Sequence, residues 1–380
     1  MGPTIMLDKS SMQSLSRMEV VVLHNLYFIN IAPVLTIEIL GDLKKQTGLT
    51  RSDVYHLSRK LLQEDSAINV HYLSLLKEDL LGRRIEMSGR PLKGGGTRVI
   101  RTDGKKGVIF EESLEEQAIR RWQNEEFTEA EHILSERWRM STTGRNVEEF
   151  QRTLQTAFPT SLPFQNLKDI RDWVDQIFDN NNIEVKRELL ITFFDFFPMM
   201  QDIASEVFLR WEHDKYPDLK KFAPYAHHCF CVLLVFMFGL RQKLLGTKAT
   251  NFVDLEYLYY LPFTIVFSSR DKFHKLFVPL FLNENQTFLD GDDLKKDLAA
   301  IKAYADSNTD GKILRPPRPD DSIASKLWQK YSSLPQSSTD TEFDFIERRR
   351  TITIDDPCPC GSGKPYRDCH LKQSDSTTMH

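Results

Sequence analysis

The stretch TIMLDKSSM, residues 4–12, decides the fold prediction, because it joins a short buried strand to a charge at the strand's end. Its first four residues are apolar or β-favouring, too few for a helix and suited to a strand in a sheet core. Asp8 follows them directly. One interpretation is that Asp8 caps a helix beginning near Ser10 or Ser11, because its carboxylate accepts hydrogen bonds from free helical N–H groups. The other is that Asp8 belongs to a site at the strand's end.

The composition indicates a folded, cytoplasmic protein. Its 380 residues are 41% hydrophobic and 27% charged, which is typical of globular chains of roughly two or three domains. The formal net charge is −4, so a nucleic-acid partner is neither required nor excluded and would need a local basic patch. The longest apolar run, residues 230–240, is shorter than the ~20 residues that span a bilayer, which predicts a buried core helix and no membrane partner. The N-terminus lacks the pattern of a signal peptide.

Apolar patterns divide the chain into five parts. Residues 1–80 alternate strand and helix, which predicts an α/β unit, and residues 246–305 return to that pattern. The part between them, 81–245, begins with a basic segment and continues as a mainly helical insertion. Residues 306–349 are rich in Pro, Ser and Asp and predict a linker with a short helix, and residues 350–375 form a cysteine-containing tail.

Four acidic residues lie near strand ends or helix starts in the α/β parts. Asp8 follows the first strand, and Glu38 lies on the helix after the second. Asp254 opens a helix, and Asp271 follows the strand in FTIVFSS. The carboxyl ends of parallel strands form the crevice where α/β sheets bind ligands, and carboxylates that gather there need a cation to hold them. Alternatively, Glu256 takes the place of Asp254, or the aspartates are helix caps and Glu38 is a solvated helical residue.

Three stretches of the chain resemble the PIN-like nuclease superfamily: IMLDKSSMQSL (residues 5–15), INIAPVLTIEILGDL (29–43) and DLEYLYYLPFTIVFSSRDKF (254–273). The resemblance implies an α/β fold, a PIN-like parallel sheet flanked by helices and split by the insertion. It also implies a metal-dependent nuclease, with RNA favoured as substrate and DNA left open. The catalytic ligands of Mg²⁺ or Mn²⁺ that it implies are Asp8, Glu38, Asp254 and Asp271.

The residue chemistry agrees with that implication. Carboxylate oxygens suit Mg²⁺ or Mn²⁺, and two such ions about 3.5–4 Å apart can activate water and stabilise the leaving oxygen in phosphodiester cleavage. Ser10 and Ser269 are candidates for binding a phosphate or orienting an acid. Asp42, one turn after Glu38, could assist it, whereas Lys9 places a cation beside the first acid.

The segment from residue 82 to residue 110 is strongly basic. It has eight Lys or Arg against two acids and three consecutive glycines, which predicts a basic hairpin or a flexible loop. This composition fits contact with nucleic-acid phosphates, and a solvated loop is the alternative. The candidates for lining a substrate path are Arg83, Arg84, Arg98, Arg101, Lys105 and Lys106.

The stretch DDPCPCGSGKPYRDCH, residues 355–370, is the most specific motif in the chain. Its three thiolates and one imidazole are the ligand set of a closed structural zinc site: Cys358, Cys360, Cys369 and His370. The stretch strongly resembles the SEC-C motif, a small zinc module that in the bacterial translocation motor SecA contacts a protein chaperone. A protein-docking role is therefore implied, with nucleic acid as the alternative partner. Cys229 and Cys231 lie in an apolar run and are predicted to be buried structural cysteines.

The sequence therefore predicts a bacterial metal-dependent nuclease with a zinc-binding tail. The alternative is a non-catalytic adaptor that keeps the fold and uses the tail to recruit a protein partner. Both predict the same architecture. They differ in whether the four carboxylates converge on one place and bind a divalent ion there.

Overall fold

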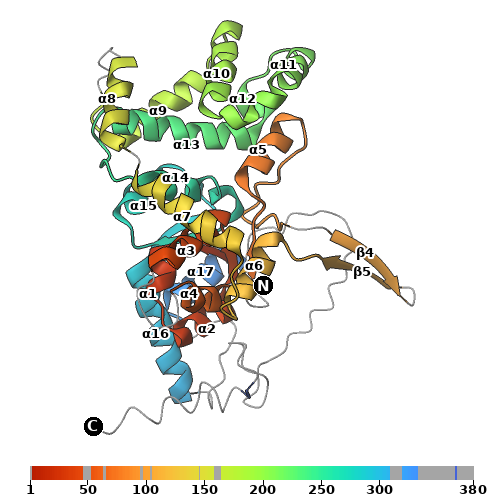
Figure 1. Cartoon of the computed structure of the whole chain (residues 1–380), viewed down its shortest axis with the longest axis vertical. Coiled ribbons are helices and arrows are strands. Elements are labelled where there is room, and N and C mark those ends of the chain that lie inside the picture. Colours follow the sequence, from red (N-terminus) through yellow and green to blue (C-terminus); the bar gives the residue numbers. More distant parts are fainter. Residues whose placement is uncertain are drawn as a thin grey trace.

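The parallel sheet is the centre of the protein. The computed structural model (Figure 1) describes residues 2–45, 53–62, 66–94, 97–102, 105–144, 146–157, 164–308, 319–332 and 364–365. Five parallel strands pair in the order β3-β2-β1-β6-β7. Their bounds are β1 Thr4–Leu7, β2 Phe28–Ile31, β3 Ser66–Ile68, β6 Val266–Ser269 and β7 Thr287–Asp290. The prediction of an α/β fold with a parallel sheet is confirmed, although β3 was not predicted.

Helices connect these strands and cover the sheet. The first half supplies α1 Lys9–Ser14, α2 Arg17–Leu26, α3 Pro33–Leu40, the 3-10 helix η1 Gly41–Lys45 and α4 Asp53–Leu61. The second half supplies α15 Lys272–Phe277, η4 Val278–Leu280 and α16 Gly291–Asn308. Local signals set their starts. Pro33 occupies the first turn of α3, where its missing N–H has no helical partner to lose, and Ser16 and Glu19 form a reciprocal capping box at α2.

The strand order reverses between β1 and β6. From β1 the chain proceeds outward to β2 and β3, and after the insertion it returns to β1's other side with β6 and β7. At the carboxyl ends of the two central strands the backbone N–H of Asp8 donates to the carbonyl of Ser268 at 3.3 Å. Such a reversal point leaves a crevice outside the strand ends, which is where open α/β sheets bind ligands.

The sequence between β3 and β6 forms a hairpin and a helical block. The hairpin strands, β4 Thr97–Thr102 and β5 Lys105–Phe110, are antiparallel. The helices are α5 Tyr72–Leu80, α6 Leu114–Trp122, α7 Glu129–Thr143, α8 Val147–Ala157, α9 Leu167–Phe178, α10 Ile183–Phe196, η2 Pro198–Ile203, α11 Ala204–His213, α12 Leu219–Phe222, α13 Pro224–Arg241, α14 Asn251–Leu258 and η3 Leu261–Phe263. In Figure 1 the hairpin projects from the side of the body, and helices α8 to α13 lie at the top, whereas α6 and α7 lie beside α3 and α4.

Helix α13 is the core of the block. By length and composition it could cross a membrane, but 83% of its apolar window is buried inside the protein. The prediction of a buried core helix is therefore confirmed, and Cys229 and Cys231 are buried free cysteines, as predicted. The ring of Phe236 on α13 lies edge-on to Phe252 of α14 and Phe273 of α15. Helix α13 thus packs against the two helices that flank the carboxyl end of β6.

The short helix expected in the linker docks on the sheet body. Helix α17, Ile323–Ser332, begins where the carboxylate of Asp297 accepts the N–H groups of Ile323 at 2.8 Å and Ala324 at 2.9 Å. The indole N–H of Trp328 donates to the carbonyl of Leu26 at 2.8 Å, and the hydroxyl of Tyr331 bonds that of Thr287. Leu26 and Thr287 lie at the amino ends of β2 and β7. Helix α17 therefore lies at the amino ends of the strands, whereas Asp8 lies at the carboxyl end of β1.

A buried carboxylate joins α5 to the N-terminus of α13. Asp79 of α5 accepts the N–H groups of Tyr225 at 2.8 Å and Ala226 at 2.9 Å, which lie in the first turn of α13. Burial raises the pKa of Asp79 to about 6, although these two hydrogen bonds and the charge of Arg210 oppose the rise. Asp79 therefore holds the N-terminus of α13 at an electrostatic cost that grows as the carboxyl ionises.

Substitution of Asp79 tests this junction. Asp79→Ala removes both hydrogen bonds and should lower the free energy of unfolding by roughly 0.5–2 kcal/mol, as at other helix caps. Asp79→Asn keeps a hydrogen-bond acceptor but cannot ionise, so it should remove the pH dependence that Asp79 gives to the free energy of unfolding. Because the folded-state pKa lies above the unfolded value, stability from this group falls as pH rises from about 4 to about 6, by up to about 2–3 kcal/mol. Urea unfolding of the parent and both variants across that pH range measures the effect; equal slopes in parent and Asp79→Asn would contradict it.

Candidate active site

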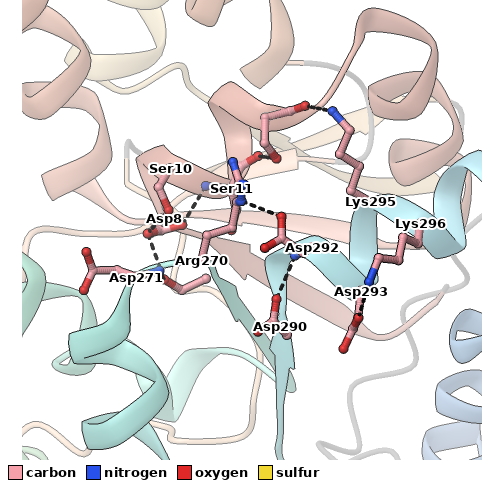
Figure 2. A network of polar contacts seen from close by, with 12 residues as sticks. Asp8, Ser10, Ser11, Arg270, Asp271, Asp290, Asp292, Asp293, Lys295 and Lys296 are labelled. Carbon is pink, nitrogen blue, oxygen red and sulfur yellow. Dashed lines mark hydrogen bonds and ion pairs between the residues drawn. The ribbon is translucent and has the colours of Figure 1, made fainter.

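Asp8 has two roles at the carboxyl end of β1. One oxygen accepts the backbone N–H of Ser11 at 2.9 Å, so Asp8 caps α1 as one interpretation of the sequence predicted. The other oxygen accepts the hydroxyls of Ser10 at 2.7 Å and Ser269 at 2.8 Å. Figure 2 shows Asp8 with the start of α1 on one side and Asp271 on the other. The second oxygen therefore ties β1 to the end of β6, which a helix cap alone does not require.

A buried histidine that the sequence analysis missed lies beside Asp8. The Nδ1 of His274 is 2.8 Å from the hydroxyl oxygen of Ser269 and 3.6 Å from Asp8, and its Nε2 is 2.8 Å from the carbonyl of Asp254. Burial alone would lower the pKa of His274, but the contact with Asp8 and the charge of Asp254 raise it to about 9. His274 is therefore an imidazolium at neutral pH, and the same pair lowers the pKa of Asp8 against the effect of burial.

Glu38 and Asp254 bring further acid to this place. The carboxylate of Glu38 on α3 accepts the hydroxyl of Tyr257 on α14 at 2.5 Å. Burial raises the pKa of Glu38, with the charge of Asp8 adding to the rise. Burial also raises the pKa of Asp254 to about 7, opposed by His274 and increased by Glu38, Asp271 and Asp8. The four predicted acids are thus close enough for their charges to act on one another.

The remaining acids near the site have other partners. The carboxylate of Asp271 caps α15, accepting the N–H of Phe273 at 2.6 Å. Asp42 pairs with the ammonium of Lys9 at 2.7 Å, and Lys9 also donates to the carbonyl of Glu38 at 2.8 Å. The charge of Glu256 acts on Tyr259 and Tyr260. Asp254 is the residue of this helix whose pKa responds to the other three acids.

Acids at the end of β7 are neutralised by neighbouring bases. Figure 2 shows Arg270 reaching Asp292, with 2.7 Å between their polar atoms, and Lys296 next to Asp293 at 3.3 Å. Asp290 pairs with Lys275. These pairs mark the rim of the site and distinguish it from the centre, where carboxylates outnumber cations.

The donor set fits a hard divalent ion in its chemistry. Carboxylate and hydroxyl oxygens suit Mg²⁺ and Mn²⁺. Burial raises the pKa of Asp254, and the charges of Glu38, Asp271 and Asp8 add to that rise. Within the described part of the chain, however, no three His, Cys, Asp or Glu side chains lie close enough together to hold one ion. The charge of Asp8 is met here by His274. Ion binding would therefore require the carboxylates to turn toward one another.

The first part of the basic segment contacts other regions. Arg83 pairs with Glu78 of α5 at 2.7 Å. The hydroxyl of Thr4 donates to the carbonyl of Gly89 at 2.6 Å, and the N–H of Gly89 donates to the carbonyl of Pro262. Thr4 begins β1, so this part passes the amino edge of the sheet, away from Asp8. The exposed Arg84 follows Arg83 in the same connection.

The later basic residues lie on the hairpin. Arg98 and Arg101 belong to β4, and Arg101 stands opposite Lys106 in the strand register. Their side chains are outside the described structure. The hairpin begins just after Gly94, whose N–H donates to the carbonyl of Ile68 at the end of β3. The basic hairpin predicted from the sequence is therefore present as backbone, at the β3 side of the sheet.

Comparison with known proteins identifies the tail. Residues 356–372 match the family model of the SEC-C motif, which often binds zinc. This match confirms the resemblance of the tail to the SEC-C motif. It covers the tail alone and gives no support to the PIN-like resemblance. The predicted zinc ligands fall within the matched residues and outside the described ones: Cys358, Cys360, Cys369 and His370. Neither the search of curated proteins nor that of solved structures found a match to the chain.

Proposed function

We propose that the protein is a metal-dependent nuclease that hydrolyses phosphodiester bonds at the carboxyl end of its sheet. The observation that carries this proposal is that Asp8 ends β1 at the strand reversal, with Glu38, Asp254 and Asp271 near enough for the charges of the other three acids to add to the rise that burial causes in the pKa of Asp254. Helix capping explains Asp8 and Asp271 singly, but it does not explain why Glu38 and Asp254 are brought beside them. RNA is the substrate that the PIN-like resemblance favours.

Each residue of this site has a distinct part in the proposal. The ligands of Mg²⁺ or Mn²⁺ would come from Asp8, Glu38 and Asp254, with Asp271 at the rim. A bound ion supplies an activated water and charge stabilisation for the leaving oxygen. Ser269 orients Asp8, since its hydroxyl donates to that carboxylate while its oxygen accepts the N–H of Asp271 at 2.9 Å.

Supporting side chains on α14 and α15 orient the acids. The hydroxyl of Tyr257 holds Glu38, and the imidazolium of His274 lies between Asp8 and the backbone of Asp254. Both side chains are buried, so their positions are fixed by the core. They would hold Asp8 and Glu38 in place before an ion arrives, and ion binding would then draw the carboxylates together.

A cleavage assay tests the nuclease proposal directly. Labelled single-stranded RNA, structured RNA and single-stranded DNA are incubated with the purified chain in Mg²⁺, in Mn²⁺ and in EDTA. We expect cleavage of RNA with a divalent ion and its loss in EDTA. A chain that cleaves none of these substrates, and whose melting temperature does not respond to either ion, would contradict the proposal.

The second candidate function is that of an adaptor, which the SEC-C match favours. In that case the zinc tail would bind a protein partner, and His274 would be the permanent counter-ion of Asp8. The same assay separates the two candidates. An adaptor would show no ion-dependent cleavage, and replacement of Asp8 would leave partner binding unchanged.

Neutralising the basic hairpin should weaken nucleic-acid binding. We would replace Arg98, Arg101, Lys105 and Lys106 with Gln. If these residues contact phosphates, the slope of log affinity against log salt should fall by about 0.7 for each lost contact with a single strand. Fluorescence anisotropy of labelled RNA across a salt series measures both effects.

A matched control comes from the other end of the basic segment. Arg83→Gln together with Arg84→Gln removes two arginine charges next to α5, where Arg83 pairs with Glu78. This control should bind RNA like the parent. Equal affinity and slope in the hairpin variant and the parent would leave the hairpin without a role in binding.

A further inference from the structure

The helical block contains an apolar cavity that none of the four acids lines. Its volume is about 150 Å³, and helices α8, α9, α10 and α13 supply its walls. Phe230, Leu234 and Phe238 of α13 form the buried floor. Trp173 of α9 and Leu189 of α10 are half-buried and lie at the outer side. The cavity is therefore reached from the surface between α9 and α10.

Aromatic contacts hold the walls of this cavity apart. Trp173 meets Phe238 edge-on, with ring centres 4.8 Å apart. Phe230 is packed edge-on between Phe178 at 5.6 Å and Phe193 at 5.5 Å. These edge-on contacts oppose rotation of the rings into the space. The cavity is thus preformed, as ligand pockets usually are.

The chemistry of the walls restricts what can occupy the cavity. The lining atoms that face the space are apolar. The hydroxyl of Thr192, at the outer side, already donates to the carbonyl of Glu188 at 2.7 Å. A water molecule finds few polar partners against apolar walls, and a space of about 150 Å³ is large enough for a ligand the size of benzene. An empty cavity also destabilises the fold in proportion to its volume.

We propose that this cavity binds a small uncharged apolar molecule, about the size of one aromatic ring. The proposal stands apart from the nuclease proposal, because it uses none of the four acids. The floor of the cavity and the wall behind the acidic site are, however, two sides of one helix. Phe230 and Leu234 face the cavity, and Phe236 contacts α14 and α15.

Toluene is the probe for the test, and the full chain is the protein used. We expect saturation-transfer NMR signals from bound toluene and a rise in melting temperature that grows with toluene concentration, since a ligand of the folded state stabilises it. Leu189→Trp should fill the cavity and weaken binding at least tenfold. Thr192→Met is a smaller substitution that fills the outer side of the cavity. It replaces Leu189→Trp in the test if that variant does not fold.

Two controls distinguish the cavity from other binding. Leu209→Trp makes the same substitution at a side chain of α11 that is 69% exposed, and it should bind toluene like the parent. Phe158 and Leu162, outside the described residues, follow α8 in sequence and are apolar. If they filled the cavity, toluene would bind only after both were changed to Ala.

The outcomes decide the proposal. Binding by the parent and by Leu209→Trp, with loss in a filled variant, supports it. Failure of the parent to bind toluene, equal binding by the parent and the filled variants, or binding that requires the Phe158→Ala and Leu162→Ala changes would each overturn it. Each of these outcomes would mean that the cavity is closed to small molecules or is filled by a side chain.

Discussion

Asp8→Asn should reduce metal-dependent cleavage by at least about 100-fold, because loss of a direct ligand should exceed the 10- to 100-fold effect of removing an outer-shell partner. Asn keeps the shape of Asp and can still cap α1, so a helix cap alone predicts almost no effect. The same substitution should therefore separate a metal ligand from a cap. Initial rates on RNA in Mg²⁺ and in Mn²⁺ measure the change.

The structure adds an expectation about the stability of this variant. His274 loses the carboxylate that keeps it charged, so at neutral pH the free energy of unfolding should fall by up to about 2–3 kcal/mol, judged from the raised pKa of about 9. Asp293→Asn is the matched control, because that carboxylate lies on α16 and pairs with Lys296. It should leave both cleavage and stability close to those of the parent. Full cleavage by folded Asp8→Asn would remove the basis of the nuclease proposal.

Replacement of two cysteines in the tail should abolish zinc binding. Purified protein is expected to contain about one zinc per chain, and Cys358→Ser with Cys360→Ser should remove it, since half of the four ligands are lost. A structural zinc site in a short peptide contributes roughly 10–16 kcal/mol of binding free energy, which is also the free energy that folds it. Elemental analysis after dialysis measures the loss.

The buried cysteines of α13 supply the control for zinc. Cys229→Ser with Cys231→Ser makes the same chemical change in the helical block, where both thiols are buried and free. It should lower stability, because a hydroxyl replaces an apolar thiol in the core, while zinc content stays at one per chain. Zinc that persists in the tail variant would refute the assignment of the tail ligands.

The sequence predicted those parts of the fold whose signal is continuous along the chain. The apolar run of residues 4–7 and the run before Asp271 became the central strands, because strands buried on both faces are mostly apolar. Strand β6 ends in two buried serines, Ser268 and Ser269. Strand β3 has three residues, Ser66–Ile68, which is too short to carry a pattern. Its place in the sheet comes from pairing with β2, which only the folded chain provides.

Site residues that directly follow a strand could be predicted from the sequence. Site residues whose position depends on how a helix is oriented could not. Asp8 and Asp271 come directly after strands, so their edge of the sheet follows from the topology. His274 and Tyr257 lie inside apolar helical stretches, where a polar side chain has no preferred direction until the helices pack. A histidine one turn after Asp271, among phenylalanines, was the signal that could have indicated His274.

The docking of α17 decides where the SEC-C tail is attached to the body. Its last residue, Ser332, lies 26 residues before Cys358, and an extended chain of that length spans at most about 90 Å. The strand β1, with four residues, is only about 13 Å long. The chain between Ser332 and Cys358 is therefore long enough to reach from the amino end of β1 to Asp8 at its carboxyl end. A molecule held by the tail would then meet the carboxylates at an effective concentration in the millimolar range, set by tether length and not by its own abundance.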